Sequence, residues 1–384
     1  MTLGDRVPWS VRSFVRRARN GFAFARLFAR QIGRWRATAA TLPRSDGLAV
    51  SYGFERMPAP GEVILGGHVK FSLLHEELPN APRDFNVLYL GSSSMPLEAP
   101  LLVRLARRRG AAFVWNQNGA AYPGWYGGGF ELVNAPRARL LHEADHVFFQ
   151  SAFCKVSADR FYGERAGPWE VLHNPVDTRR FTPATERPQR PLTLLLGGSQ
   201  YQRYRLESAL ETLALVRRER PDARLIVAGS LSFAPDGPAL TATLLRRLHL
   251  EEAVELRGPY PQDEAPELMR RADLLLHTKY NDPCPTVVLE AMACGLPVVY
   301  SASGGTPELV GAEAGFGIPA PLDWERDHPP AVADLADAVL RVAEQPDEYA
   351  AAARERALRF DALTWIERHY TVFTNLIRQR AGLS

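Results

Sequence analysis

Two carboxylates near residue 285 stand in a pattern that suits a phosphorylated ligand. Asp282 and Glu290 are eight positions apart, and segment 285–294 begins with proline and ends ahead of a glycine. Proline is preorganised for a first helical position and glycine often ends a helix, so this segment is predicted to be a short helix. The first N–H groups of a helix lack intrahelical acceptors, which makes those of Thr286 and Val287 candidate phosphate ligands.

A parallel sheet is the element that must position these residues. The apolar run 272–276 predicts a buried strand, and the polar segment 278–284 is the loop that leads from it into the helix. From residue 47 onward, similar short apolar runs alternate with amphipathic stretches, a pattern typical of α/β proteins with parallel sheets. Beyond residue 319 the sequence is predicted to be helical to its end.

The string DPCPTVVLEAMACGLPVV, which starts at Asp282, resembles the nucleotide-sugar signature of the retaining glycosyltransferases of the GT-B fold, group 1 or family 4 type. In that family an acid is followed eight positions later by Glu and then by Ala-Met-Ala-x-Gly-x-Pro-Val. The string GGTPELV at 304–310 and the string HNPVDTRRFTP at 173–183 strengthen the resemblance. The chain departs from the pattern with Asp in place of the first Glu, and with Pro283-Cys284-Pro285 after it.

The resemblance implies a fold and a division of the chain. The fold is α/β of the GT-B type, with two doubly wound Rossmann-like domains facing across a cleft and a C-terminal crossover helix. The first domain, 46–185, would bind the acceptor and the second, 186–355, the nucleotide sugar. The Pro-rich stretch at 183–191 predicts the linker, with a boundary near 184–190. The segment 356–384 would pack back on the first domain.

The resemblance also implies roles for donor-site residues. Glu290 would accept hydrogen bonds from the ribose, and Asp282 would accept them from the transferred sugar. Counted from Gly197, Arg203 falls where the family has a lysine facing the diphosphate, although an exposed Arg at a helix start is an alternative. Arg205 is a further candidate cation. Asp282, Arg203 and Glu290 form the expected catalytic set, and the expected donor-binding set is Gly66, Gly67, Gly198, Arg203, Arg205, Asp282, Cys284, Thr286, Val287 and Glu290.

The loop 116–130 is the candidate acceptor site. It is rich in amides, aromatic residues and glycine, and it follows a predicted strand end. The family often has a histidine in this loop, and this chain has none there. The candidate acceptor residues are Asn116, Gln117, Asn118, Tyr122, Trp125 and Tyr126, and an ordinary surface loop is the alternative. The resemblance implies transfer without a metal or cofactor, to a glycan or glycolipid acceptor, and gives no reason to expect a nucleic-acid partner.

Composition bounds the class of protein. The chain has 384 residues, with 46% hydrophobic and 23% charged, which is ordinary for a globular protein of two domains. No apolar run approaches the roughly 20 residues of a spanning helix. Cys154, Cys284 and Cys294 lack metal-ligand spacing, and their odd number favours a reducing cytoplasm. No nearby histidine is placed to activate Cys284 as a nucleophile.

The N-terminal 45 residues form a basic extension. Residues 1–44 hold ten Arg and one acid, and 9–35 has an apolar stripe at helical spacing opposite a row of arginines. Such a helix can bind an anionic membrane surface through residues 9–37, which would put the protein at the inner face of the cell membrane. A helix docked on the protein itself and a targeting peptide are the alternatives.

Three functions fit the sequence. The first is a retaining glycosyltransferase. A non-catalytic, membrane-associated protein that binds nucleotide sugars is motivated by Asp282, by Gly198 in the position of the family's Arg and by the missing histidine. The third is a sugar-nucleotide epimerase or a phosphorylase of the same fold.

Overall fold

The computed structural model describes residues 47–59, 61–62, 66–186 and 190–382. The basic segment 9–37 lies outside this part of the chain. None of the described helices has the length and apolar character needed to cross a membrane.

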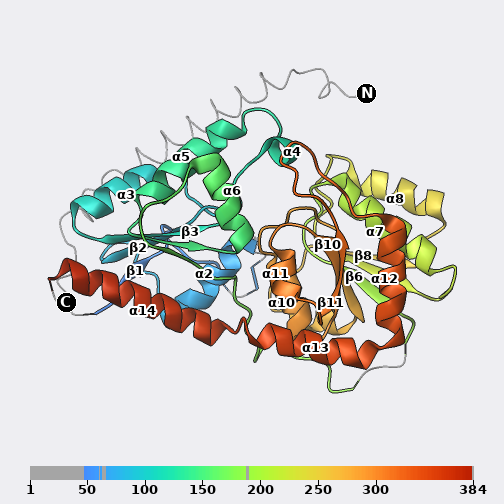
Figure 1. The fold of residues 1–384 in the computed structure, drawn as a ribbon. Helices are drawn as coiled ribbons and strands as arrows, with labels where there is room; N and C mark the ends of the chain where they lie inside the picture. Colours follow the sequence, from blue (N-terminus) through green and yellow to red (C-terminus); the bar gives the residue numbers. More distant parts are fainter. Residues whose placement is uncertain (1–46, 60, 63–65, 187–189, 383–384) are drawn as a thin grey trace.

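Five parallel strands make the first sheet, and they lie in sequence order (Figure 1). Strands β2 and β3 are buried along their whole length because helices cover both faces of the sheet. Helices α3, α5 and α6 pack on one face, and α2 packs on the other. The strands are β1 (Val50–Ser51), β2 (Val87–Gly91), β3 (Ala112–Gln117), β4 (His146–Phe149) and β5 (Trp169–Val171). The helices are α2 (Gly66–Glu77), α3 (Ala99–Arg108), α4 (Pro123–Tyr126), α5 (Phe130–Glu143) and α6 (Ala152–Tyr162).

Six parallel strands make the second sheet, in the order β11-β10-β9-β6-β7-β8. The strands are β6 (Thr193–Leu196), β7 (Arg224–Ala228), β8 (Val254–Gly258), β9 (Leu274–His277), β10 (Val298–Ala302) and β11 (Gly315–Pro319). Among the described strands, only this sheet shows the reversal of strand order that defines double winding, and the reversal lies between β6 and β9. The prediction of two parallel-sheet, Rossmann-like domains is confirmed.

Helices cover both faces of the second sheet. One face carries α7 (Arg203–Val216), α8 (Gly237–Leu248) and α12 (Val332–Glu344). The other carries α9 (Ala265–Arg270), α10 (Thr286–Ala293), α11 (Thr306–Val310) and α13 (Pro346–Leu358). Pro285 is the N-cap residue of α10 rather than its first helical residue, so the helix starts one position later than predicted.

The C-terminal helix α14 (Ala362–Arg380) crosses back to the first sheet, where it lies beside α2 (Figure 1). Its Trp365, Val372 and Phe373 are buried against Phe71 and the tyrosine of β2. The crossover is therefore made by α14 alone, because α13 stays packed on α10.

The segment after β10 differs from the prediction in two places. A sixth strand, β11, pairs with β10 where no strand was expected. Residues 320–331 are not helical as predicted. They instead reach the first domain, where the backbone N–H of Gly124 donates to the carbonyl of Trp324 at 2.8 Å. This segment contains several prolines, which lack the N–H that a helix needs.

Candidate active site between the two domains

A cavity of about 690 Å³ lies between the two domains. Its walls include residues that follow β2, β3 and β4 in the first sheet, and residues that follow β6 and β9 in the second. These positions are the carboxyl ends of parallel strands, where open α/β sheets bind ligands. The two sheets therefore present their binding edges to one shared space.

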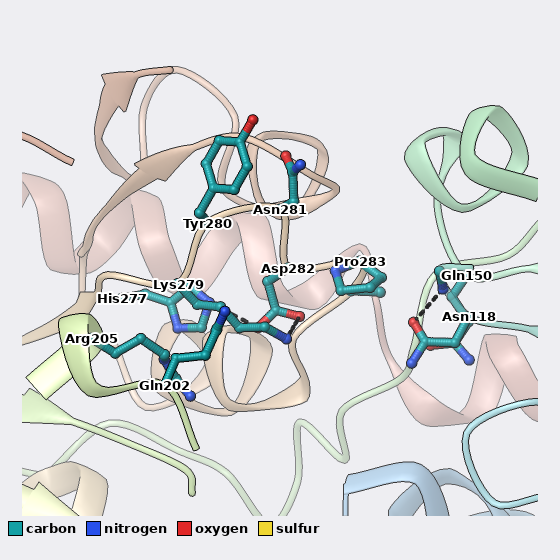
Figure 2. A network of polar contacts seen from close by, with 12 residues as sticks. Asn118, Gln150, Gln202, Arg205, His277, Lys279, Tyr280, Asn281, Asp282 and Pro283 are labelled. Atoms are coloured by element: carbon teal, nitrogen blue, oxygen red, sulfur yellow. Dashed lines mark hydrogen bonds and ion pairs between the residues drawn. The ribbon is translucent and has the colours of Figure 1, made fainter. Parts of the chain in front are cut away.

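Asp282 is the only carboxylate among the described residues that line this cavity. Its carboxylate meets His277 Nε2 at 3.2 Å and Lys279 Nζ at 3.2 Å. Burial alone would raise the pKa of Asp282, but the Lys279 ammonium and the His277 hydrogen bond hold it well below its ordinary value. Burial lowers the pKa of His277, so its ring is neutral at pH 7. Figure 2 shows this cluster together with Arg205 on the second domain.

The start of α10 faces the same cavity. Cys284, Thr286 and Val287 all line it. The backbone N–H of Val288 already donates to the Pro285 carbonyl at 3.1 Å, so the N–H groups of Thr286 and Val287 are the ones a ligand can use. Burial raises the pKa of the Cys284 thiol, which keeps it protonated and unsuited to act as a nucleophile.

Arg205, rather than Arg203, is the arginine of α7 that lines the cavity. Arg203 begins the helix, its side chain is 52% exposed, and it pairs with Glu207. Arg205 is 3% exposed and donates through Nη1 to the Ser199 carbonyl, while its buried Nε has no hydrogen-bond partner. Residues two positions apart in a helix point roughly 200° away from each other around its axis. Arg203 therefore faces solvent while Arg205 faces the cavity.

Gly198 precedes this helix at the cavity wall. Its φ of +82° is one that residues with a side chain rarely adopt. An arginine at this position, as in the family pattern, would therefore be strained in this backbone conformation.

Glu290 does not share the cavity with Asp282. It lines a second cavity of about 390 Å³, and Thr286 lines both. The Glu290 carboxylate accepts a hydrogen bond from Gln262 Nε2 and is 5% exposed. Burial raises its pKa to about 7, although Gln262 and Arg180 oppose this shift. The two acids thus lie on either side of the α10 start.

The predicted acceptor residues divide into two groups. Asn118, Tyr122 and Trp125 line the main cavity. Asn116, Gln117 and Tyr126 do not, and Asn116 and Gln117 are buried because β3 extends two residues beyond the predicted strand end. Of the two glycines that open α2, Gly67 lines the cavity.

Several residues that line the cavity were not predicted from the sequence. Lys70, Arg137 and Tyr162 come from α2, α5 and α6 of the first domain, and Lys279 comes from the loop after β9. Lys279 stands three positions before Asp282, so its place in the loop could have predicted that it lies near this acid. The other three are far apart in sequence, and no local pattern connects them.

Direct contacts hold the two domains together beside the cavity. Glu308 of α11 accepts from the backbone N–H groups of Ala152 and Phe153 at 2.8 and 3.0 Å, at the start of α6. It also meets His173 Nε2 at 3.0 Å. Ser151 donates to the Pro283 carbonyl at 2.7 Å. The described part of the chain contains no group of three or more His, Cys, Asp or Glu side chains that could hold a metal ion.

Residues 177–358 match the family model described as "Glycosyl transferases group 1". This chain carries a group 1 glycosyl transferase domain. The matched range contains the second sheet, Arg205 and both acids. The resemblance to the group 1 family is therefore confirmed over residues 177–358.

Curated relatives resemble the group 1 domain and its surroundings at modest identity. The chain is 29% identical over 239 residues to a glycogen synthase of Mycobacterium tuberculosis, which covers 62% of this chain and 54% of that protein. It is 28% identical over 195 residues to a D-inositol 3-phosphate glycosyltransferase of Streptomyces avermitilis, covering 46% and 42%. The chain thus spans about half the length of these relatives.

Solved structures confirm the GT-B fold around the group 1 domain. A sucrose-phosphate synthase from Thermosynechococcus elongatus superposes with a TM-score of 0.64 at 19% identity, covering 92% of this chain and 93% of that one. Anabaena HepE in complex with UDP-glucose superposes with a TM-score of 0.61 at 18% identity, covering 80% and 82%.

Proposed function

We propose that the protein is a glycosyltransferase that moves a sugar from a nucleotide diphosphate sugar to an acceptor, with retention of anomeric configuration. One observation carries this proposal. Within a group 1 domain, Arg205 is buried in the interdomain cavity with an unpartnered Nε. A buried polar group without a partner is costly, so this arginine favours an anionic ligand.

The donor fits as an extended ligand that passes the start of α10. Its diphosphate would meet Arg205 and the N–H groups of Thr286 and Val287, which suit the charge that grows as the nucleotide departs. Thr286 borders both cavities, so the nucleoside would lie beside Glu290 and the sugar beside Asp282. Lys279 keeps Asp282 ionised and ready to accept sugar hydroxyls.

Retention is favoured by what the first domain brings to the cavity. Among the residues that the structure describes, those of the first domain that line the cavity, from Gly67 to Asn174, contain no carboxylate and no histidine. An inverting transferase needs such a base on the acceptor hydroxyl. In its absence, the departing diphosphate oxygen is the natural proton acceptor, and it lies on the face that the nucleotide leaves.

The acceptor and the location of the protein are part of the same proposal. Asn118, Tyr122 and Trp125 would bind a glycan or glycolipid. The basic residues 9–37 would bind an anionic membrane surface from the cytoplasm, bringing the cavity to a lipid-linked acceptor. Removing residues 1–42 should abolish binding to anionic vesicles and leave donor hydrolysis intact. Undiminished vesicle binding would refute the membrane role.

A panel of nucleotide sugars tests the activity. UDP-glucose is the first donor to try because a relative's structure contains it. A bound donor at 100 times its Kd should stabilise the protein by about 2.7 kcal/mol in a thermal unfolding assay. Slow donor hydrolysis should follow, and NMR of the released sugar would report the anomer. Binding without turnover would instead favour a non-catalytic protein, and a changed but unreleased sugar would favour an epimerase.

A further inference from the structure

The first domain places two cations in the cavity without carboxylate partners. Lys70 is 3% exposed, and its Nζ donates to the neutral amide oxygen of Asn174 at 3.2 Å. Burial lowers the pKa of Lys70 to about 8. Arg137 is half-buried and donates to two backbone carbonyls, that of Ser92 from Nε at 3.1 Å and that of Val133 from Nη1 at 2.7 Å. Among the described residues, no carboxylate pairs with either.

Tyr162 completes a polar corner beside Arg137. This tyrosine is 8% exposed and lines the cavity, yet its hydroxyl has no hydrogen-bond partner of good geometry. Burial raises the pKa of Tyr162 to about 12, while Arg137 and Gln117 oppose the shift, so both lie close to the hydroxyl. Arg137 still has Nη2 free of any hydrogen bond to the described residues. Two residues that line the cavity, Arg137 and Tyr162, therefore each keep a donor that is not committed to another side chain or backbone group by good geometry.

The charges that line the cavity point the same way. Within the described part of the chain, the lining contains four cations, Lys70, Arg137, Arg205 and Lys279, and one carboxylate, Asp282. Lys279 is paired with Asp282, and Arg205 with the start of α10 can bind a donor diphosphate. The two cations of the first domain are then left over, on the side where the acceptor enters. Buried charges are normally paired, so a second anion is missing from the protein itself.

We propose that the acceptor carries an anionic group, a phosphate or a carboxylate, which accepts hydrogen bonds from Arg137 Nη2 and the Tyr162 hydroxyl. This inference rests on the proposed transferase function and adds the chemical class of the acceptor. A planar guanidinium next to a hydroxyl donor matches either anion, because both offer several acceptor oxygens. Lys70 adds positive potential deeper in the same wall.

Inorganic phosphate and acetate are the probes, each titrated into the full-length protein saturated with nucleoside diphosphate so that the Arg205 region is occupied. Chloride at matched ionic strength is the reference. We expect phosphate, acetate or both to raise the unfolding midpoint above the chloride reference. A response to phosphate alone indicates a phosphorylated acceptor, and a response to acetate alone indicates a carboxylated one.

Three variants locate the response. Arg137→Gln should weaken binding of the anion at least tenfold. Tyr162→Phe removes only an unpartnered hydroxyl, so it should weaken the anion severalfold without lowering stability. Arg139→Gln is the matched control, because Arg139 lies on the same helix, is 63% exposed and pairs with Glu143. It should respond like the wild type.

The proposal is overturned if neither probe exceeds chloride, or if Arg137→Gln and Tyr162→Phe both keep the full response. Failure of the transferase function looks different, since the wild type would then neither bind nor hydrolyse any nucleotide sugar. The difference in unfolding midpoint between wild type and Arg137→Gln, at one fixed nucleotide concentration, reports on the anion site. It does so whether or not the protein hydrolyses a nucleotide sugar.

Discussion

The two walls of the interdomain cavity are built in opposite ways. In the wall from the second domain the carboxylate is internally paired, with Asp282 bonded to His277 at the end of β9 and to Lys279 in the loop that follows, while the buried Arg205 Nε is left for a ligand. The wall from the first domain collects Lys70, Arg137 and Tyr162 from three separate helices, pairs none of them with a carboxylate, and leaves the Tyr162 hydroxyl without a hydrogen-bond partner.

This difference matches two tasks: binding the donor, which is common to every reaction of the protein, and selecting the acceptor. A paired, locally encoded cluster holds its geometry without ligand, as binding of a common donor requires. Unpaired donors are stabilised only when a partner arrives, so they discriminate strongly between ligands that satisfy them and ligands that do not. We therefore expect substitutions in the second domain to affect every reaction of the protein, and those in the first domain to depend on the acceptor.

The largest expected effect is in the second domain, at Arg205. Arg205→Ala should weaken binding of nucleoside diphosphate by about 3 kcal/mol, or roughly 100-fold, because hydrogen bonds to a charged group are lost. Free nucleoside should bind as before. Arg203→Ala is the control, since that side chain is exposed and paired with Glu207. Calorimetry that finds equal losses for the two variants would return the phosphate role to Arg203.

Asp282→Asn tests the paired cluster itself. Bare nucleoside diphosphate should bind nearly normally, whereas turnover of the intact donor should fall by about 2 kcal/mol, or about 30-fold, because a charged hydrogen bond to the sugar is lost. Initial rates and calorimetry on the same preparation give both readings. A tenfold loss of nucleotide affinity with normal turnover would show that Asp282 and Glu290 have exchanged roles.

The same comparison explains what could be predicted from the sequence. The second wall follows β9 within a few residues, so a strand, a loop and a helix in series were enough to place Asp282, Thr286 and Val287 near one another. Arg203 was predicted as the phosphate ligand by counting positions from Gly197, and this count placed the wrong arginine in the cavity. The helix α7 begins at Arg203, and the angle of each side chain around the helix axis decides which arginine faces inward.

The first wall required the tertiary structure. Lys70, Arg137 and Tyr162 share no spacing, and only the packing of α2, α5 and α6 on one sheet brings them to a common cavity. The prediction that the loop 116–130 lines the acceptor site was correct for only some of its residues, for a related reason. Asn116 and Gln117 continue β3, so they are buried, and only the residues beyond the strand end reach the cavity.

A smaller effect should appear in the pH dependence of nucleotide binding. Burial raises the pKa of Glu290 to about 7, so ribose hydroxyls that donate to its ionised form should bind more tightly as pH rises from 6 to 8. The gain should be about tenfold. Stability changes in the opposite sense, because the contribution of protonated Glu290 is full below its ordinary pKa of 4.5 and is lost as pH rises through about 7.

Glu290→Gln should flatten both profiles. Calorimetry at several pH values measures the first, and urea unfolding measures the second. Nucleotide affinity that still rises with pH in Glu290→Gln would assign the titration to another group.

The smallest effect is expected where the two walls meet, at Gly124. A Cβ there would lie 2.6 Å from the backbone nitrogen of Arg326 and 2.9 Å from the backbone carbon of Glu325, and backbone atoms cannot rotate away. Gly124→Ala should therefore push the 324–326 segment off α4 and lose the hydrogen bond to the Trp324 carbonyl, at a cost of roughly 1 kcal/mol. The substitution does not touch the hydrogen-bonding residues of the cavity, so kcat should stay the same. KM for the nucleotide sugar should rise a few-fold, because the domains separate more readily. Gly128→Ala is the matched control, because nothing lies within 4 Å of its added Cβ. Hydrogen exchange at Gly124 and across 320–331 reports the contact directly. If exchange there stays slow in Gly124→Ala while KM rises, the two walls communicate by another route, and contact between the domains at this segment does not set donor affinity.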